Sequence, residues 1–222
     1  MESKKYNERK KRVSQMILVL SKLFPEAKMA LKYSNNWELL VAVILSAQCT
    51  DKRVNEVTKE LFKKYRKLED YVNVDLSEFE QDIKSTGFFR NKAKNILTAA
   101  RVVKEEFDGK LPKTMEAMLT IPGVARKTAN VVLGNAYNIV EGIAVDTHVR
   151  RFVIRFDLSD YRDPVRIEKD LMEIIPKKYW FLITYYLIDY GRAVCPAREH
   201  DCVLHPLTKI YPKASQLWPR AK

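Results

Sequence analysis

Lys127 and Asp146 are the two residues of this chain whose types and surroundings best suit covalent chemistry. Lys127 lies on the first turn of a helix expected over 124–137, directly after a break at Pro122 and Gly123. The positive helix end and the neighbouring Arg126 both disfavour an ammonium group, so we expect a lowered pKa for Lys127. A less protonated amine is a better nucleophile and can form a Schiff base with a sugar aldehyde carbon.

Asp146 follows a short apolar run and precedes a helix expected over 147–157, which is the position of an N-cap. Helix capping alone would explain an aspartate there. If the carboxylate also faces Lys127 across a groove, it can stabilise positive charge that develops on a deoxyribose, or assist proton transfer.

The break at Gly123 is a candidate anion site. Glycine permits a positive φ between the helix expected over 114–120 and the next one, and lets another backbone come close. Backbone N–H groups near Gly123 and Ala125 and the helix dipole favour an anion such as a DNA phosphate. An ordinary connection between two helices would show the same Pro-Gly pair.

Composition agrees with a nucleic-acid partner. The chain has 222 residues and a formal net charge of +12, a balance that suits a polyanion. The longest apolar run, 39–45, is far too short to span a bilayer, and the charged N-terminus lacks the apolar stretch of a secretory signal. Three cysteines give no disulfide framework, so we expect an intracellular protein with no membrane partner.

The pattern predicts an all-α protein, because β-type alternations are few and only six glycines occur. Helices are expected over 8–24, 37–48, 51–65, 76–85, 89–107, 114–120, 124–137, 147–157, 164–175 and 178–193.

Five segments in order resemble the endonuclease III family of helix-hairpin-helix DNA glycosylases. They are LLVAVILSAQCTD, STGFFRNKAKNI, IPGVARKTANVVLGNA, AVDTHVRR and YLIDYGRAVC. The resemblance implies that Lys127 is the nucleophile and Asp146 its partner. The family often has glycine where Ala125 stands, a change that a helix start tolerates well.

The resemblance also implies two helical domains. A six-helix barrel would span 29–139 and contain the hairpin at about 114–137. A second domain would combine 1–28 with 140–222 and keep a remnant of the family's cluster loop at 195–211. The active groove would lie between the two domains.

Further positions suit an enzyme that flips a base out of the duplex. The family uses the residue matching Gln48 to fill the gap, and Phe88 lies where relatives place an apolar wedge. Burial under the loop is the alternative for Phe88 or Phe89, and His148 is expected to be structural. Basic candidates for phosphate contacts are Arg90, Lys92, Lys94, Arg126, Arg150 and Arg151.

The C-terminal segment departs from the family, whose members usually carry a four-iron, four-sulfur cluster on C-x6-C-x2-C-x5-C. Cys195 and Cys202 keep the first spacing, but His205 and Tyr211 occupy the third and fourth positions. Tyrosine is a poor cluster ligand, so we predict no cluster and no metal. Zinc on Cys195, His200, Cys202 and His205 is chemically possible but matches no common spacing. Apolar tail residues could pack the loop instead: Pro206, Leu207, Ile210, Tyr211 and Trp218.

The resemblance implies a monomeric bifunctional glycosylase and abasic-site lyase. It would excise oxidised pyrimidines from damaged double-stranded DNA and cut the strand 3′ of the lesion by β-elimination. We expect it in the nucleoid-containing cytoplasm of a prokaryote, or in a eukaryotic nucleus. Two alternatives remain: a monofunctional mismatch glycosylase of the same fold, whose members lack a lysine at position 127, and a non-catalytic DNA-binding protein.

Overall fold

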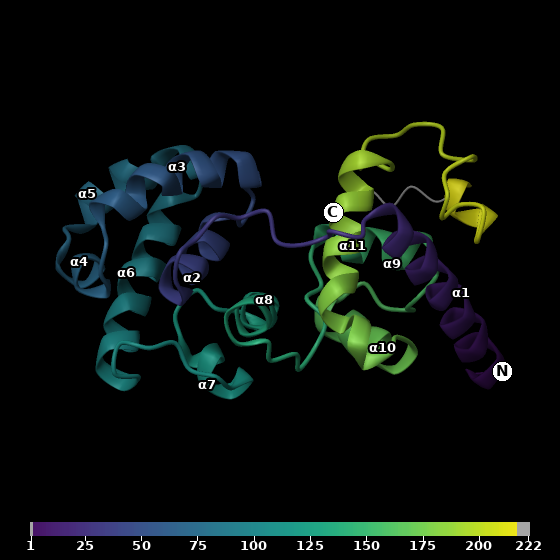
Figure 1. The fold of residues 1–222 in the computed structure, drawn as a ribbon, viewed down its shortest axis with the longest axis horizontal. Coiled ribbons are helices and arrows are strands. Elements are labelled where there is room, and N and C mark those ends of the chain that lie inside the picture. The colour runs from purple at the N-terminus through teal and green to yellow at the C-terminus, as the bar shows by residue number, and fades with distance from the viewer. Residues whose placement is uncertain (1, 217–222) are drawn as a thin grey trace. The chain divides into compact units, whose positions relative to one another are not determined.

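Helices make up all the regular structure of the residues described, as predicted (Figure 1). The structure is a computed structural model that describes residues 2–216, without the side chains of Glu2 and Ser3; Trp218 lies outside this range. None of the described helices combines the length and the apolar character needed to cross a membrane.

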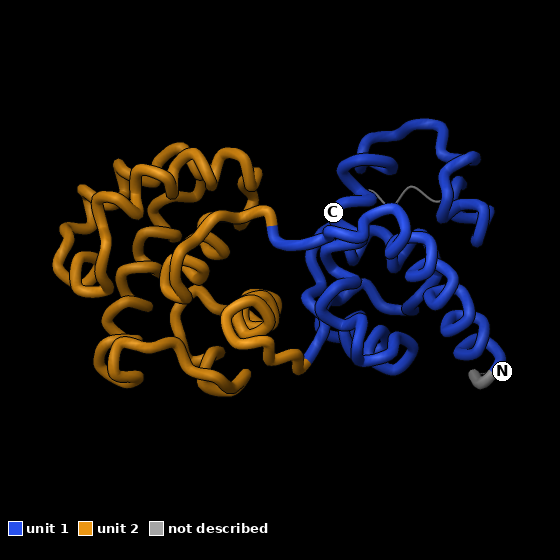
Figure 2. Tube along the Cα trace, viewed as in Figure 1, with its two compact units in different colours: residues 1–29, 142–222 blue, residues 30–141 orange. Residues whose placement is uncertain are grey.

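The chain divides into two compact units (Figure 2). Residues 30–141 form one continuous unit, and residues 1–29 join residues 142–222 in the other. The N-terminal helix therefore belongs with the C-terminal part of the chain rather than with the sequence that follows it.

The continuous unit is built around α2. Its apolar residues between Leu39 and Leu45 are all buried, which is the pattern of a helix surrounded by others. Helix α2 packs on α8, and α6 packs on α4 and α5. The helices of this unit are α2 (Asn36–Leu45), α3 (Asp51–Lys64), α4 (Leu68–Asn73), α5 (Leu76–Ile83), α6 (Phe89–Glu106), α7 (Met115–Thr120) and α8 (Arg126–Tyr137), with a 3-10 turn η1 (Lys84–Thr86).

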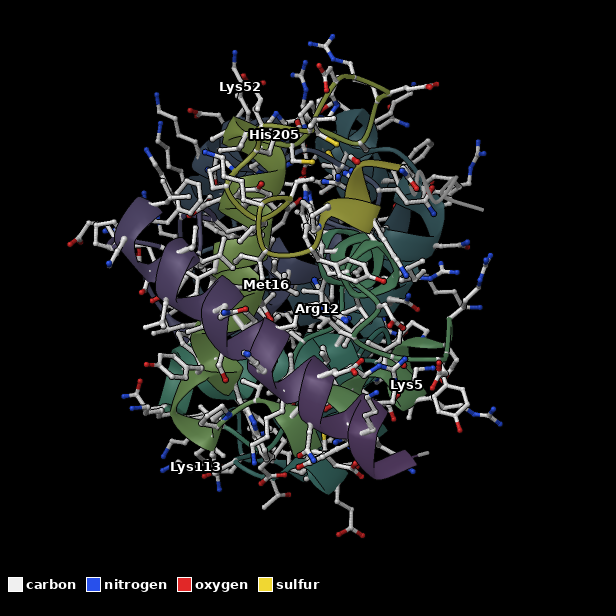
Figure 3. The ribbon with its side chains drawn as sticks, turned by 90° about the vertical axis from the view of Figure 1, so that its right-hand side faces the viewer. Lys5, Arg12, Met16, Lys52, Lys113 and His205 are labelled. Atoms are coloured by element: carbon white, nitrogen blue, oxygen red, sulfur yellow. The ribbon has the colours of Figure 1, made fainter. Side chains whose placement is uncertain are left out.

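The other unit packs α1 against α10 and α11, and α9 against α11. Met16 of α1, labelled in Figure 3, is fully buried in its apolar core. Arg9 of the same helix donates to the carboxylates of Asp157 and Asp160. Hydrogen bonds from Arg9 and Lys5 hold the pKa of the Asp160 carboxyl below its ordinary value. The elements are α1 (Glu2–Leu23), α9 (Thr147–Arg155), α10 (Pro164–Ile174), η2 (Lys177–Tyr179), α11 (Trp180–Ala193) and η3 (Pro212–Gln216).

Several predicted helix boundaries were wrong. Helix α1 begins at Glu2 instead of residue 8, and α8 begins at Arg126 instead of residue 124. Helix α2 ends at Leu45 instead of residue 48, because Gln48 adopts a left-handed φ of 53° that no α-helix contains. Helix α4, with six residues, was not predicted.

Candidate active site and DNA-binding loops

The hairpin between α7 and α8 turns at Gly123, which has the predicted positive φ, at +81°. A Cβ atom on Gly123 would lie 2.9 Å from the Cβ of Asn95, so α6 also requires glycine there. The N–H of Val124 donates to the carbonyl of Ile121 at 3.1 Å. The Val124 N–H is therefore not one of the unpaired N–H groups that we expected near Gly123 and Ala125.

Helix α8 begins without a capping side chain. Ala125 is its N-cap and has no oxygen to offer the first-turn N–H groups, and the first turn contains no acidic residue. Instead, Arg126 and Lys127 place two cationic side chains at the positive end of the helix, both half-buried. An anion bound at this end would therefore meet both the helix dipole and two cations.

Asp146 is the N-cap of α9, as the sequence indicates. One carboxylate oxygen accepts a hydrogen bond from the N–H of Val149 at 2.8 Å, and the side chain is half-buried. Apolar residues on both sides fix the cap, because Val145 and Val149 are buried in the core of this unit. Asp146 therefore stands at a rigid position, held by its own helix.

The two arginines that follow Asp146 on α9 differ from each other in exposure. Arg150 is half-buried, whereas Arg151 is buried and donates to the carbonyls of Cys195 at 2.9 Å and Pro196 at 3.3 Å. The expectation that Arg151 binds phosphate was wrong, because its guanidinium supports the C-terminal loop. A Cβ on Gly191 would lie 2.4 Å from Nδ1 of His148, so α11 approaches α9 closely there.

Gln48 and Phe88 both adopt left-handed backbone conformations in exposed loops. Their φ angles are 53° and 48°, values that residues other than glycine seldom adopt. The Phe88 side chain is 62% exposed, and Phe89 is half-buried beneath Arg90, whose guanidinium lies 5.1 Å from the Phe89 ring centre. Strained, exposed residues of this kind often serve binding, and Phe88 has the exposure that a wedge requires.

A buried lysine ties these two loops together. Lys92 on α6 is 4% exposed, and its ammonium donates to the carbonyls of Leu45 and Thr86, each at 2.8 Å. Leu45 ends the helix before Gln48, and Thr86 lies just before Phe88. Burial lowers the pKa of Lys92. The expectation that Lys92 binds phosphate was wrong; the side chain positions both loops instead.

Helix α6 is therefore the common support of the DNA-binding segments expected in this unit. Lys92 holds the Gln48 and Phe88 loops, and Asn95, three residues later on the same face, contacts Gly123 of the hairpin. The sequence offered one signal for Lys92, because it shares a helical face with buried Ile96, Ala99 and Val103. The charge of Lys92 suggested a surface position, but its place on the buried face of the helix was the better indicator.

The C-terminal loop does not supply the ligands of a four-cysteine cluster. Cys195 and Cys202 are buried, and the guanidinium of fully buried Arg155 donates to each sulfur at 2.9 Å. The ring of Tyr211 instead lies beneath the guanidinium of Arg12, 4.0 Å away. Of the tail residues expected to pack the loop, Leu207 is fully buried and joins the apolar core.

An all-helical fold with a lysine at the helix start behind a Pro-Gly hairpin defines a helix-hairpin-helix protein. The family model described as "HhH-GPD superfamily base excision DNA repair protein" matches residues 41–177.

Similarity to known proteins shows which group within this superfamily the chain resembles. Endonuclease III of Synechocystis sp. is 50% identical over 211 residues, covering 95% of this chain and 96% of the relative. Endonuclease III of Bacillus subtilis is 47% identical over 189 residues, covering 85% and 86%. A solved structure of a trapped endonuclease III–DNA covalent intermediate superposes with a TM-score of 0.88 at 41% identity, covering 93% of this chain and 97% of that one. The chain belongs to the endonuclease III family.

Proposed function

We propose that this protein is a bifunctional DNA glycosylase and abasic-site lyase that acts on damaged duplex DNA in base excision repair. The observation that carries the proposal is Lys127, an amine on the first turn of a helix that no side chain caps, directly behind the Gly123 turn. A trapped covalent intermediate with DNA among the similar structures agrees with such an amine as nucleophile.

Binding begins with the phosphate backbone. The uncapped start of α8, with Arg126 beside it, attracts a phosphate, and Arg90 and Arg150 add further contacts. Phe88 enters the base stack as a wedge, and Gln48 fills the gap left by the flipped nucleotide. Because Lys92 holds both loops, these two side chains act from one support.

The chemical step is covalent. The neutral amine of Lys127 attacks C1′ of the flipped nucleotide, and the glycosidic bond breaks as the base leaves with its electron pair. The bound nitrogen loses one proton, and the C1′–O4′ bond breaks with its electron pair going to O4′, which takes up a proton; this opens the sugar ring and gives a protonated Schiff base. Removal of a proton from C2′ then breaks the bond between C3′ and its oxygen, which cuts the strand 3′ of the lesion.

Asp146 supplies the negative charge that the departure of the base needs. Its carboxylate stabilises the positive charge that develops on the sugar as the base departs. The hydrogen bond from Val149 fixes the carboxylate before the substrate arrives, so little reorganisation is needed during the reaction.

We propose oxidised or ring-saturated pyrimidines as the substrates, and the nucleoid or the nucleus as the place of action. The 30–141 unit would be the six-helix barrel of the family and the other unit its second domain, in a monomeric enzyme. We also propose that no four-iron cluster is bound, because this chain has three cysteines and only two are in the loop. The steps assigned to Lys127 and Asp146 use no iron.

Borohydride trapping tests the proposal. Wild type and Lys127→Ala are incubated with end-labelled duplexes that contain either one thymine glycol or one abasic site. We expect a covalent adduct and a cut strand on both duplexes for the wild type, and neither for Lys127→Ala. Lys104→Ala removes an exposed lysine from the last turn of α6 and is the matched control, with wild-type trapping expected.

Other outcomes would redirect the proposal. Trapping on the abasic duplex alone would establish a lyase and reject thymine glycol as substrate. Base release without an adduct would point to a monofunctional glycosylase. DNA binding with steep salt dependence, no lesion preference and no adduct would indicate a non-catalytic protein.

A further inference from the structure

The loop that follows α11 gathers three side chains that bind transition metals. The sulfur of Cys195 and one ring nitrogen each of His200 and His205 all lie within 4.8 Å of one another. Tetrahedral zinc, with bonds of about 2.3 Å to sulfur and 2.0 Å to nitrogen, places its ligand atoms roughly 3.3–3.8 Å apart. Movements of about an ångström would therefore bring these three atoms onto one ion.

The two histidine rings already have a suitable separation. Their centres lie 5.1 Å apart, with an angle of 31° between the ring planes. Two imidazoles bound to one tetrahedral zinc have ring centres roughly 5 Å apart, given the usual zinc–nitrogen distance. The two histidines are also separated by four residues, within the H-x3–5-H range of many zinc sites.

The hydrogen bonding of each ring suits a metal ligand. Nδ1 of His200 lies 2.8 Å from the carbonyl oxygen of Arg198, and a proton on Nδ1 would leave the lone pair on Nε2. Metal-bound histidines commonly donate their other N–H to a backbone carbonyl in this way. Nδ1 of His205 is buried and has no hydrogen-bond partner among the described residues, so this ring carries a buried polar atom that the protein itself leaves unsatisfied.

The third ligand is held in place by two arginines of α9. Arg155 donates to the sulfur of Cys195, and Arg151 donates to its carbonyl, each at 2.9 Å. The backbone N–H of His205 donates to the carbonyl of Cys202 at 3.1 Å, which fixes the other end of the cluster (His205 is labelled in Figure 3). The fold of this unit therefore holds Cys195 and His205 near each other before any ion binds.

We propose that Cys195, His200 and His205 bind one zinc ion. A thiolate with two imidazoles is a soft, nitrogen-rich set that suits zinc, and the fourth tetrahedral position is left for a water molecule. The ion fastens the loop to α9 and α11. This proposal replaces the sequence-based expectation of no metal, and it does not depend on the DNA chemistry proposed above.

Metal analysis of the full-length protein tests the site. Protein is purified from cells supplied with zinc and iron, and then dialysed; zinc, iron and acid-labile sulfide are measured per chain. We expect one zinc per wild-type chain and no sulfide. His200→Gln and His205→Gln should weaken zinc binding at least tenfold, as loss of a ligand contact does. Cys49→Ser changes a cysteine of the other unit and should keep the zinc.

Cobalt(II) substitution provides a second readout. Cobalt in this site should give visible ligand-field bands and a sulfur-to-cobalt charge-transfer band, the latter lost in Cys195→Ser. Both histidines are only half-buried, so their glutamine variants should fold, which circular dichroism checks. A wild type that takes up no added zinc would overturn the proposal. So would full zinc binding by both histidine variants, or iron together with sulfide.

Discussion

The two helices that carry the proposed catalytic residues begin in opposite ways. Helix α9 starts at Asp146, whose carboxylate caps the first turn, whereas α8 starts at Ala125, which offers no capping oxygen. The first turn of α8 also carries two cations where the helix dipole favours anions. One helix start is therefore capped by a side chain of its own, and the other has no side-chain cap.

If α8 binds DNA as proposed, this difference is one in which stability is given up for function. A capping side chain at α8 would satisfy its amides and stabilise the fold, but would compete with a DNA phosphate for the same N–H groups. At α9, the same carboxylate can serve the fold and the reaction, because capping orients it. The comparison leads to four predictions, ordered from the largest expected effect to the smallest.

Lys127→Arg separates the positive charge at position 127 from the role of its amine as a nucleophile. Arginine keeps the positive charge, but its guanidinium does not act as an amine nucleophile. We expect strand cutting to fall by on the order of 10⁴-fold or more, as with other covalent nucleophiles, while affinity for duplex DNA stays near that of the wild type. Single-turnover cutting assays and fluorescence anisotropy measure the two effects. Retention of the borohydride adduct by the arginine variant would remove Lys127 from the mechanism.

Asp146→Asn and Asp146→Ala separate capping from catalysis at α9. Asparagine caps as well as aspartate, so only the alanine variant should lose about 1 kcal/mol of unfolding free energy. Both lack the negative charge, and we expect base release to fall by about 10²–10⁴-fold in each. Urea denaturation and single-turnover glycosylase assays give the two values. If asparagine restored activity, Asp146 would have only a structural role.

Gly123→Ala tests the hairpin turn. Alanine at a φ of +81° costs about 1–2 kcal/mol, and its Cβ would also collide with Asn95. Gly109→Ala is the matched control, because Gly109 has a similar φ of +71° and its nearest neighbouring atom would be 3.8 Å away. We expect Gly123→Ala to be the more destabilising in urea denaturation, and the only one to weaken DNA binding. Equal losses in both variants would argue against the close approach of α6.

Ala125→Asp gives α8 the cap that α9 already has. We expect the unfolding free energy to rise by about 1 kcal/mol, while DNA affinity falls and the salt slope of binding decreases by about one. Ala125→Ser, a neutral cap, should stabilise the fold with a smaller loss of affinity. DNA titrations at several salt concentrations measure the affinity and the salt slope, and urea denaturation measures the unfolding free energy. An aspartate variant with unchanged DNA affinity would show that no phosphate binds at this helix start.

The sequence predicted those features that depend on a few neighbouring residues. Asp146 caps a helix where its type and position indicated, because an N-cap is a contact across three residues. The buried run of α2 and the positive φ of Gly123 also follow from local pattern. Two local features were missed: the six-residue helix α4 was not predicted, and Gln48 leaves the helix that its neighbours favour.

Only the tertiary structure decided which charged and metal-binding side chains are surrounded by protein. Lys92 and Arg151 look like surface cations in the sequence, yet both are buried, and carbonyls far away in the chain, at Leu45 and Cys195, accept their hydrogen bonds. The Cys195, His200 and His205 cluster likewise depends on how the loop folds back on α9. Local rules act over one turn of helix, whereas burial and the distances between side chains are set by packing between segments far apart in the chain.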